Sequence, residues 1–198
     1  MSTAAACLVL AVLELDAALV AQTLASRPLV VGALLGALTG ETQAGMLFGA
    51  AFELLSLCDL PVGGCLTWST PVAAGTATVI AAGGASIPFA FAGGVLAGIL
   101  HTRAEAFERG RRASTGDELA GRAEAGGGAL GRALAYSIGL HAAMTFAVAG
   151  GVAAAVLAVD RRWWADAPDF LRAGAALMAA SAPWLGLAGV TAWGLRRS

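Results

Sequence analysis

Three carboxylates lie inside strongly apolar sequence: Glu14, Asp16 and Glu53. An ionised side chain at the centre of a bilayer costs about 2.5 to 3.5 kcal/mol even on the lenient insertion scale, so in a membrane these groups must face protein or water. Glu14 and Asp16 are two residues apart and point to nearly opposite sides of a helix, so we expect at most one to share a cavity with Glu53. We favour Asp16. The alternative is that the acids pair with Arg27 or cap helix ends.

A carboxylate accepts hydrogen bonds from several hydroxyls at once, which suits a sugar or another neutral polyol, although a cation or a proton is drawn to the same group. Uncharged polar side chains and an aromatic ring lie near the proposed chain breaks and favour a hydroxylated ligand. Each of them can instead satisfy a loose backbone group. The candidate substrate-binding residues from this pattern are Glu53, Asp16, Gln22, Trp68, Ser69 and Thr70.

Residues for catalysis or metal binding do not occur at useful spacing. The chain has neither a GxSxG nor an HExxH motif, so we predict no catalytic residue, metal site or cofactor. We expect His101 at the membrane edge and His141 as a hydrogen-bonded core residue. Cys7, Cys58 and Cys65 lack CxxC spacing and are expected to be small core hydrophobes.

The composition indicates a bilayer protein. Of the 198 residues, 58% are hydrophobic and 13% are charged, whereas about a quarter of the residues in soluble domains are charged. The 12 basic residues are all Arg and face 13 acids, so no basic surface is available for nucleic acid. We therefore predict an all-α, polytopic transmembrane protein.

A helix needs about 20 residues to cross the hydrocarbon layer, and three stretches reach that length: 4–24, 133–159 and 171–195. In contrast, Pro28 to Leu60 consists of two short apolar arms separated by 39–43. This pattern predicts a re-entrant, broken-helix hairpin, whose exposed backbone must line a sheltered cavity.

A second interrupted stretch runs from Pro71 to Leu100 and is broken by Gly83 and Gly84. It is two tightly turned crossings or another broken pair, and the remaining alternative is one kinked, glycine-rich helix. Paired interruptions are typical of transporters. Glycines at four-residue spacing, such as Gly32 and Gly36, indicate close helix packing, which we assign mainly to contacts within the chain.

The chain divides into three regions. An N-terminal membrane region, 1–102, contains the hairpin 28–60; an Arg-rich, partly helical loop, 103–132, is expected in the cytoplasm; and a two-span membrane region covers 133–198. We expect about six membrane segments in all.

Several spaced motifs carry a family resemblance: LELD at 13–16, SRPL at 26–29, LTGE at 38–41, FELLSL at 52–57 and LPVG at 60–63. Together they resemble the IIC membrane subunit of the mannose/fructose/sorbose-type bacterial phosphotransferase system. The resemblance covers about the first hundred residues closely. Glu41 stands where the family usually has Asp, and it joins the candidate binding residues on that basis.

The resemblance implies a multi-pass subunit of the bacterial inner membrane that binds a hexose in a cavity of broken helices and translocates it. It also implies a IID membrane partner, a cytosolic IIB partner and an oligomeric assembly. Phosphoryl transfer would be done by separate IIA and IIB proteins, so the IIC subunit is expected to be a carrier and not an enzyme.

Two departures from the family pattern favour an alternative. The segment 66–71 replaces the Pro-Asp element that commonly follows the LPVG turn, and we expect the chain to end earlier than family members usually do. The alternative is a shortened, transport-inactive IIC-like scaffold or regulatory partner. A third reading, an ion- or proton-coupled permease, rests only on the buried acids.

Overall fold

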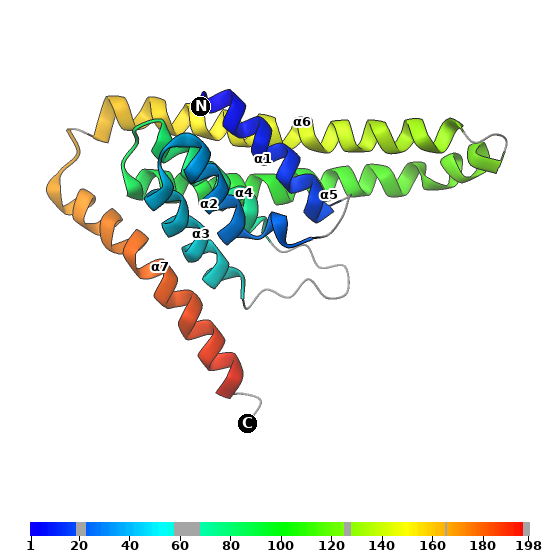
Figure 1. The fold of residues 1–198 in the computed structure, drawn as a ribbon. Helices are drawn as coiled ribbons and strands as arrows, with labels where there is room; N and C mark the ends of the chain where they lie inside the picture. The colour runs from blue at the N-terminus through cyan, green and yellow to red at the C-terminus, as the bar shows by residue number, and fades with distance from the viewer. Residues whose placement is uncertain (19–22, 58–67, 125–127, 165, 196–198) are drawn as a thin grey trace.

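Helices of very unequal length form the protein (Figure 1). The computed structural model describes residues 1–18, 23–57, 68–124, 128–164 and 166–195. Within these ranges no strand occurs, which confirms the all-α prediction. The elements are α1 (Thr3–Ala18), η1 (Leu24–Ser26), α2 (Pro28–Thr39), α3 (Thr42–Ser56), α4 (Thr70–Ala82), α5 (Ile87–Glu124), α6 (Gly128–Val159), η2 (Asp160–Trp164) and α7 (Asp169–Leu195).

The predicted break in the stretch 28–60 is confirmed, because α2 and α3 are separate helices that fold back on each other. Gly40 ends α2 in the left-handed region, with φ 88°, a conformation that glycine adopts without a steric penalty. Their glycines interlock: a Cβ on Gly45 would collide with the backbone of Gly32 and Gly36. The glycine spacing thus serves packing within the chain, as predicted.

The second interruption is also a true break. α4 ends at Ala82, Gly84 turns the chain with φ 90°, and α5 begins at Ile87. A Cβ on Gly94 would meet the carbonyl oxygen of Ala73, and a Cβ on Gly98 would meet that of Ser69, so the two helices run antiparallel and in close contact. This arrangement excludes a single kinked helix and matches the broken-pair interpretation.

The Arg-rich segment 103–132 is more regular than the partly helical loop that we expected. α5 continues through it to Glu124 and α6 begins at Gly128, so every described residue of the segment is helical. The physical reason is composition: Ala, Glu and Arg are strong helix formers, and the ion pairs Glu105–Arg109 and Glu108–Arg112 have the i,i+4 spacing that stabilises helices. α5 and α6 lie side by side and extend beyond the other helices in Figure 1.

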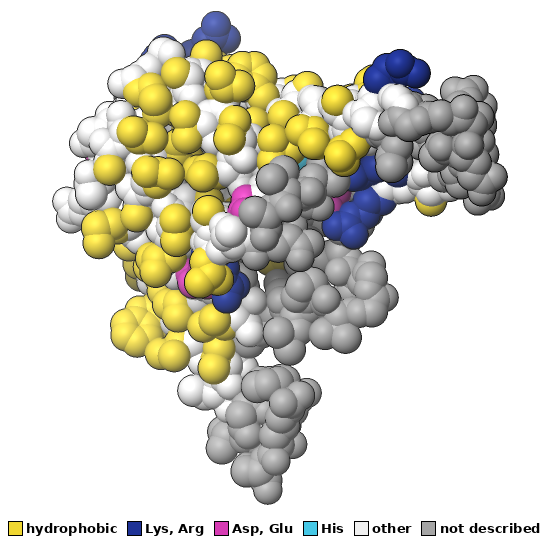
Figure 2. Space-filling view, turned by 45° about the vertical axis from the view of Figure 1, so that its right-hand side comes forward, with side chains coloured by type: hydrophobic (Ala, Val, Ile, Leu, Met, Phe, Trp, Pro, Cys, Tyr) yellow, Lys and Arg dark blue, Asp and Glu magenta, His cyan; other side chains and the backbone are white. Residues whose placement is uncertain are grey.

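Three of the described helical segments are long and apolar enough to cross a membrane: Ile87–Ser114, Gly131–Trp164 and Asp169–Ala192. The last two correspond to the predicted crossings at 133–159 and 171–195. The predicted crossing at 4–24 is not among them, because α1 has 16 residues and is about 24 Å long; positions 19–22 lie outside the described residues. Figure 2 shows hydrophobic side chains over much of the visible surface, as lipid contact requires.

The core is centred on α4, whose side chains from Val72 to Ile80 are fully buried. α2 and α3 cover it on one side, while α1, α5 and α6 pack around the rest. Phe52 of α3 stacks on Phe91 of α5 with ring centroids 5.0 Å apart and meets Trp68 edge-on at 5.7 Å. These rings connect the first hairpin to α5.

Candidate functional site

Glu53 lies in the last turns of α3, at the end of the hairpin opposite Gly40. Its Oε1 is 3.6 Å from Nη1 of Arg27, and its Oε2 accepts a hydrogen bond from the backbone N–H of Leu29 at 3.4 Å. The carboxylate therefore occupies the N-terminus of α2, where N–H groups lack helical partners and the helix dipole favours negative charge. The alternative of pairing with Arg27 and capping a helix is realised in the structure.

Asp16 reaches the same short turn from the other side. It accepts hydrogen bonds from the backbone N–H of Thr23 at 3.1 Å and from its hydroxyl at 2.9 Å. Thr23 is the N-cap of η1 and Arg27 is its C-cap. Asp16 and Glu53 thus contact opposite ends of one turn, and we call Asp16, Thr23, Arg27 and Glu53 the hairpin mouth.

Two other predicted residues are not part of the hairpin mouth. Glu41 is exposed in the turn between α2 and α3, and the twelve-residue separation from Glu53 corresponds to about 18 Å along a helix. Gln22 lies outside the described residues.

The segment that leads into α4 divides between two surroundings. Trp68 packs edge-on against Phe52, the residue before Glu53, and so lies beside α3. Ser69 and Thr70 are buried at the start of α4, and the Ser69 hydroxyl donates to Oε1 of Glu14 at 3.0 Å. Of these three, Trp68 is the residue with a ring contact to the helix that carries Glu53.

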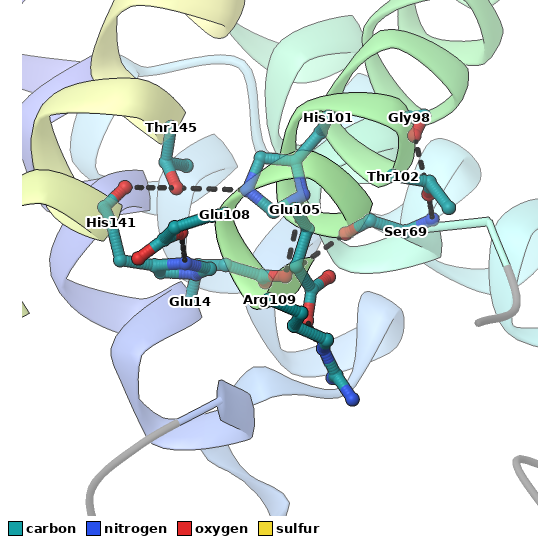
Figure 3. A network of polar contacts seen from close by, with 10 residues as sticks. All are labelled: Glu14, Ser69, Gly98, His101, Thr102, Glu105, Glu108, Arg109, His141 and Thr145. Carbon is teal, nitrogen blue, oxygen red and sulfur yellow. Dashed lines mark hydrogen bonds and ion pairs between the residues drawn. The ribbon is translucent and has the colours of Figure 1, made fainter. Parts of the chain in front are cut away.

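A second polar group lies in the core, and we call Glu14, His101, Glu108, His141 and Thr145 the core cluster (Figure 3). Of the two acids in α1, Glu14 is the buried one, with 5% of its surface exposed, whereas Asp16, which we favour as the neighbour of Glu53, lies at the hairpin mouth. The helix turns successive residues by about 100°, so burial of one acid leaves the other nearer the surface.

His101 lies in the interior of the protein, and its expected position at the membrane edge stays a prediction. Its side chain is fully buried in α5, and its Nε2 is 2.9 Å from the hydroxyl of Thr145 on α6. The neighbouring α6 covers the position that the sequence alone places next to the polar segment. The imidazole is thereby held between two helices.

His141 is a hydrogen-bonded core residue, as predicted. Its Nδ1 is 3.0 Å from Oε2 of Glu108, and its ring meets that of His101 edge-on with centroids 5.4 Å apart. Forty positions separate the two histidines, so the sequence gives no direct sign of the contact. Glu105 and Glu108 lie one and two turns after His101 on the same helix, so the sequence does place acids on the helix face of this histidine.

The acids of α5 beside and within the core cluster are each paired with an arginine of the same helix. Glu105 contacts Arg109 at 2.6 Å and Glu108 contacts Arg112 at 3.4 Å, both at i,i+4 spacing. Among the described residues, no group of three or more His, Cys, Asp and Glu is placed to hold a metal ion. The core cluster is therefore a group of buried acids and imidazoles in which His141 bonds to Glu108 and His101 bonds to Thr145.

Comparison with known proteins gives one match. The model of the family described as "PTS system sorbose-specific iic component" matches residues 1–114, which is more than half of the chain. The match includes α1 to α4, the hairpin mouth and the apolar part of α5. No curated protein and no solved structure matches the chain.

Proposed function

The chain belongs to the sorbose-specific IIC component family of the phosphotransferase system, and from this we propose that it carries a hexose across the bacterial inner membrane. IIC components are membrane transport subunits, and IIA and IIB proteins perform the phosphoryl transfer. The proposal adds a multi-pass topology and a sugar site at the hairpin mouth. The observation that carries it is the meeting of Asp16 and Glu53 at one turn beside a broken-helix hairpin.

The chemistry of Glu53 suits a ligand that enters and leaves. Its hydrogen bond from Leu29 is long, at 3.4 Å, and its ion-pair contact with Arg27, at 3.6 Å, lies beyond hydrogen-bond distance. The side chain is 19% exposed, and a carboxylate offers about four acceptor positions. Sugar hydroxyls can therefore take over these positions at little cost, while the ring of Trp68 supplies an apolar face nearby.

The proposed partners are a IID membrane subunit and a cytosolic IIB protein, within an oligomeric assembly. Only 11% of the apolar stretch of α7 is buried within the protein. Its outer face is thus available to lipid or to another membrane subunit. This exposure supports a larger assembly, and co-purification with a IID subunit tests it.

Binding of a labelled hexose to the purified chain together with its IID partner tests the sugar site. We expect E53Q to weaken binding about tenfold or more, because a hydrogen bond to a charged group contributes about 1.5 to 3 kcal/mol. The matched control is D169N, since Asp169 pairs with Arg172 at the start of α7, away from the hairpin mouth. Unchanged hexose binding in a folded E53Q protein refutes the site.

Transport itself is tested in vesicles that contain the chain and IID, supplied with IIA, IIB and phosphoenolpyruvate. We expect sugar phosphate to accumulate inside. If a sample that binds IID accumulates none, the chain is a transport-inactive scaffold and the carrier proposal fails. Uptake that follows the pH gradient and needs no phosphoenolpyruvate would instead identify a proton-coupled permease.

A further inference from the structure

The hydrogen-bond directions around His101 can be read from its neighbours (Figure 3). The hydroxyl of Thr145 donates its single proton to the backbone carbonyl of His141, at 3.0 Å. In its 2.9 Å contact with Nε2 of His101 the same hydroxyl must therefore accept, so Nε2 carries a proton. A neutral His101 then has a bare lone pair at Nδ1.

That lone pair faces another acceptor. Nδ1 of His101 is 4.0 Å from Oε1 of Glu14, and both side chains are buried, with 0% and 6% of their surface exposed. Nδ1 of His101 and Oε2 of Glu14 have no hydrogen-bond partner in the described part of the chain. Oε1 of Glu14 accepts from Ser69, but Oε2 of Glu14 and Nδ1 of His101 are buried without any described donor, which is costly because neither atom replaces the hydrogen bonds it made to water.

The charges around this contact also fail to balance. On α5, Glu105 and Glu108 are each matched by an arginine one turn later. Glu14, which approaches from α1, forms its single ion-pair contact in the described structure with His101, and Ser69 of α4 offers it only a neutral hydroxyl. An ionised Glu14 beside a neutral His101 would thus be a buried charge without a counter-charge.

His141 adds a further acceptor from α6. Since its Nδ1 lies 3.0 Å from the Glu108 carboxylate, which can only accept, Nδ1 carries a proton, and in a neutral His141 ring Nε2 is then bare. Nε2 is buried and has no hydrogen-bond partner among the described residues. The core cluster therefore has four acceptors without a hydrogen-bond partner among the described residues, on Glu14, His101, Glu108 and His141. The one on Glu108, Oε1, lies 3.4 Å from Arg112, whereas the other three have no cation beside them in the described structure.

We propose that the core cluster is a proton-binding site that holds one proton between Nδ1 of His101 and the carboxylate of Glu14. One proton turns the facing acceptors into a donor and an acceptor and removes the unbalanced charge, whether it resides on the imidazole or on the carboxyl. The bound proton connects α1 to α5, and the His101–Thr145 contact extends the connection to α6. This inference does not depend on sugar binding at the hairpin mouth.

The test is nitrogen magnetic resonance of the histidine rings in the full-length protein, purified in lipid nanodiscs near neutral pH. The chain contains two histidines, so the H141Q variant assigns both sets of ring signals. We expect either a doubly protonated His101 ring or a His101 Nδ1 that accepts a proton from Glu14. In the second case infrared spectra show a protonated carboxyl band that is absent from E14Q.

E14Q also replaces the shared proton by a neutral amide N–H that can donate to Nδ1, so its His101 ring is expected to be neutral. E53Q is the matched control, because it removes a carboxylate that contacts Arg27 instead of a histidine, and it should leave both signatures unchanged. The wild-type spectra decide the question even if E14Q does not fold. A neutral His101 with an unbonded Nδ1, together with no protonated carboxyl band, overturns the proposal.

Discussion

Two helical hairpins of this protein use opposite means to hold their helices together. In the α2–α3 pair, glycines bring the backbones into direct contact, as Gly32 and Gly45 do. In the α5–α6 pair, buried polar side chains connect the helices, through His141 with Glu108 and His101 with Thr145. The first needs only small residues at a fixed spacing, whereas the second needs each polar atom to find its partner.

The difference has a consequence for how sensitive each hairpin is to change. Steric contact tolerates loss of a group but not the addition of one, since an added methyl has no room. A buried polar pair responds in the reverse way, because removal of one partner leaves the other uncompensated. The two hairpins should therefore fail under different substitutions.

The largest effect is expected for E108A in the α5–α6 pair. The substitution leaves His141 without its hydrogen-bond partner and Arg112 without this carboxylate. Breaking a buried pair typically costs about 3 to 5 kcal/mol, so we expect the free energy of unfolding in detergent micelles to fall by that amount. D169A, which removes an exposed partner of Arg172, should change it by about 1 kcal/mol or less. Equal losses in the two variants would contradict the role of the buried pair.

The next effect is expected for G45A in the α2–α3 pair. The new methyl collides with the backbone of Gly32 and Gly36, which cannot move away as a side chain can. Overpacking costs about 1 to 3 kcal/mol, measurable by the same unfolding assay. G150A is the control, because nothing lies within 4 Å of a Cβ at that position of α6. It should be neutral or slightly stabilising, since Ala favours helix over Gly by about 1 kcal/mol; a loss as large as that of G45A would mean that steric contact is not the cause.

A smaller effect is expected for G40A, which separates the turn of the first hairpin from its packing. A Cβ at Gly40 meets no atom within 4 Å, so only the backbone conformation at φ 88° opposes alanine. A left-handed alanine costs about 1 to 2 kcal/mol. G40N should lose less, because asparagine adopts this region more readily. If both variants unfold like the wild type, the turn conformation does not contribute to stability.

The smallest effect is expected for S86A, which tests the end of the α5–α6 pair. The Ser86 hydroxyl donates to Oδ1 of Asp160 at 3.1 Å and so connects the α4–α5 turn to the end of α6. Loss of this hydrogen bond should lower the free energy of unfolding by about 0.5 to 1.5 kcal/mol. The hydroxyl of Ser181 donates to the carbonyl of Met178 within α7, so S181A should be closer to neutral. The reverse order would show that the Ser86 contact is not formed.

Most of the fold was predictable because the residues that end its helices can be recognised from the local sequence. The polar residues between the two apolar arms at 28–60, with Gly40 among them, interrupt a helix whatever packs around it. Gly83 and Gly84 do the same farther along the chain. The segment 103–132 was predicted less well, because its polarity indicated exposure to water and exposure was taken to imply a loop. Its i,i+4 ion pairs, such as Glu105 with Arg109, were the better guide.

The candidate site was less predictable for a physical reason. That Glu53 faces protein follows from the cost of burying charge in lipid, and its pairing with Arg27 was among the alternatives. Which acid of α1 points inward depends on where α4, α5 and α6 pack, and no pattern within 3–18 determines that. The meeting of His101 and His141 likewise depends on the register of two long helices.

The aromatic stack beside the hairpin mouth limits how α3 can move. Phe52 immediately precedes Glu53, and its ring lies nearly parallel to that of Phe91, at an angle of 8°. Consecutive side chains on a helix differ in direction by about 100°, so any rotation of α3 about its axis that redirects the carboxylate also separates the two rings. Exposing Glu53 alternately to the two sides of the membrane would thus require α3 and α5 to travel as one body, or the stack to open and re-form in every cycle.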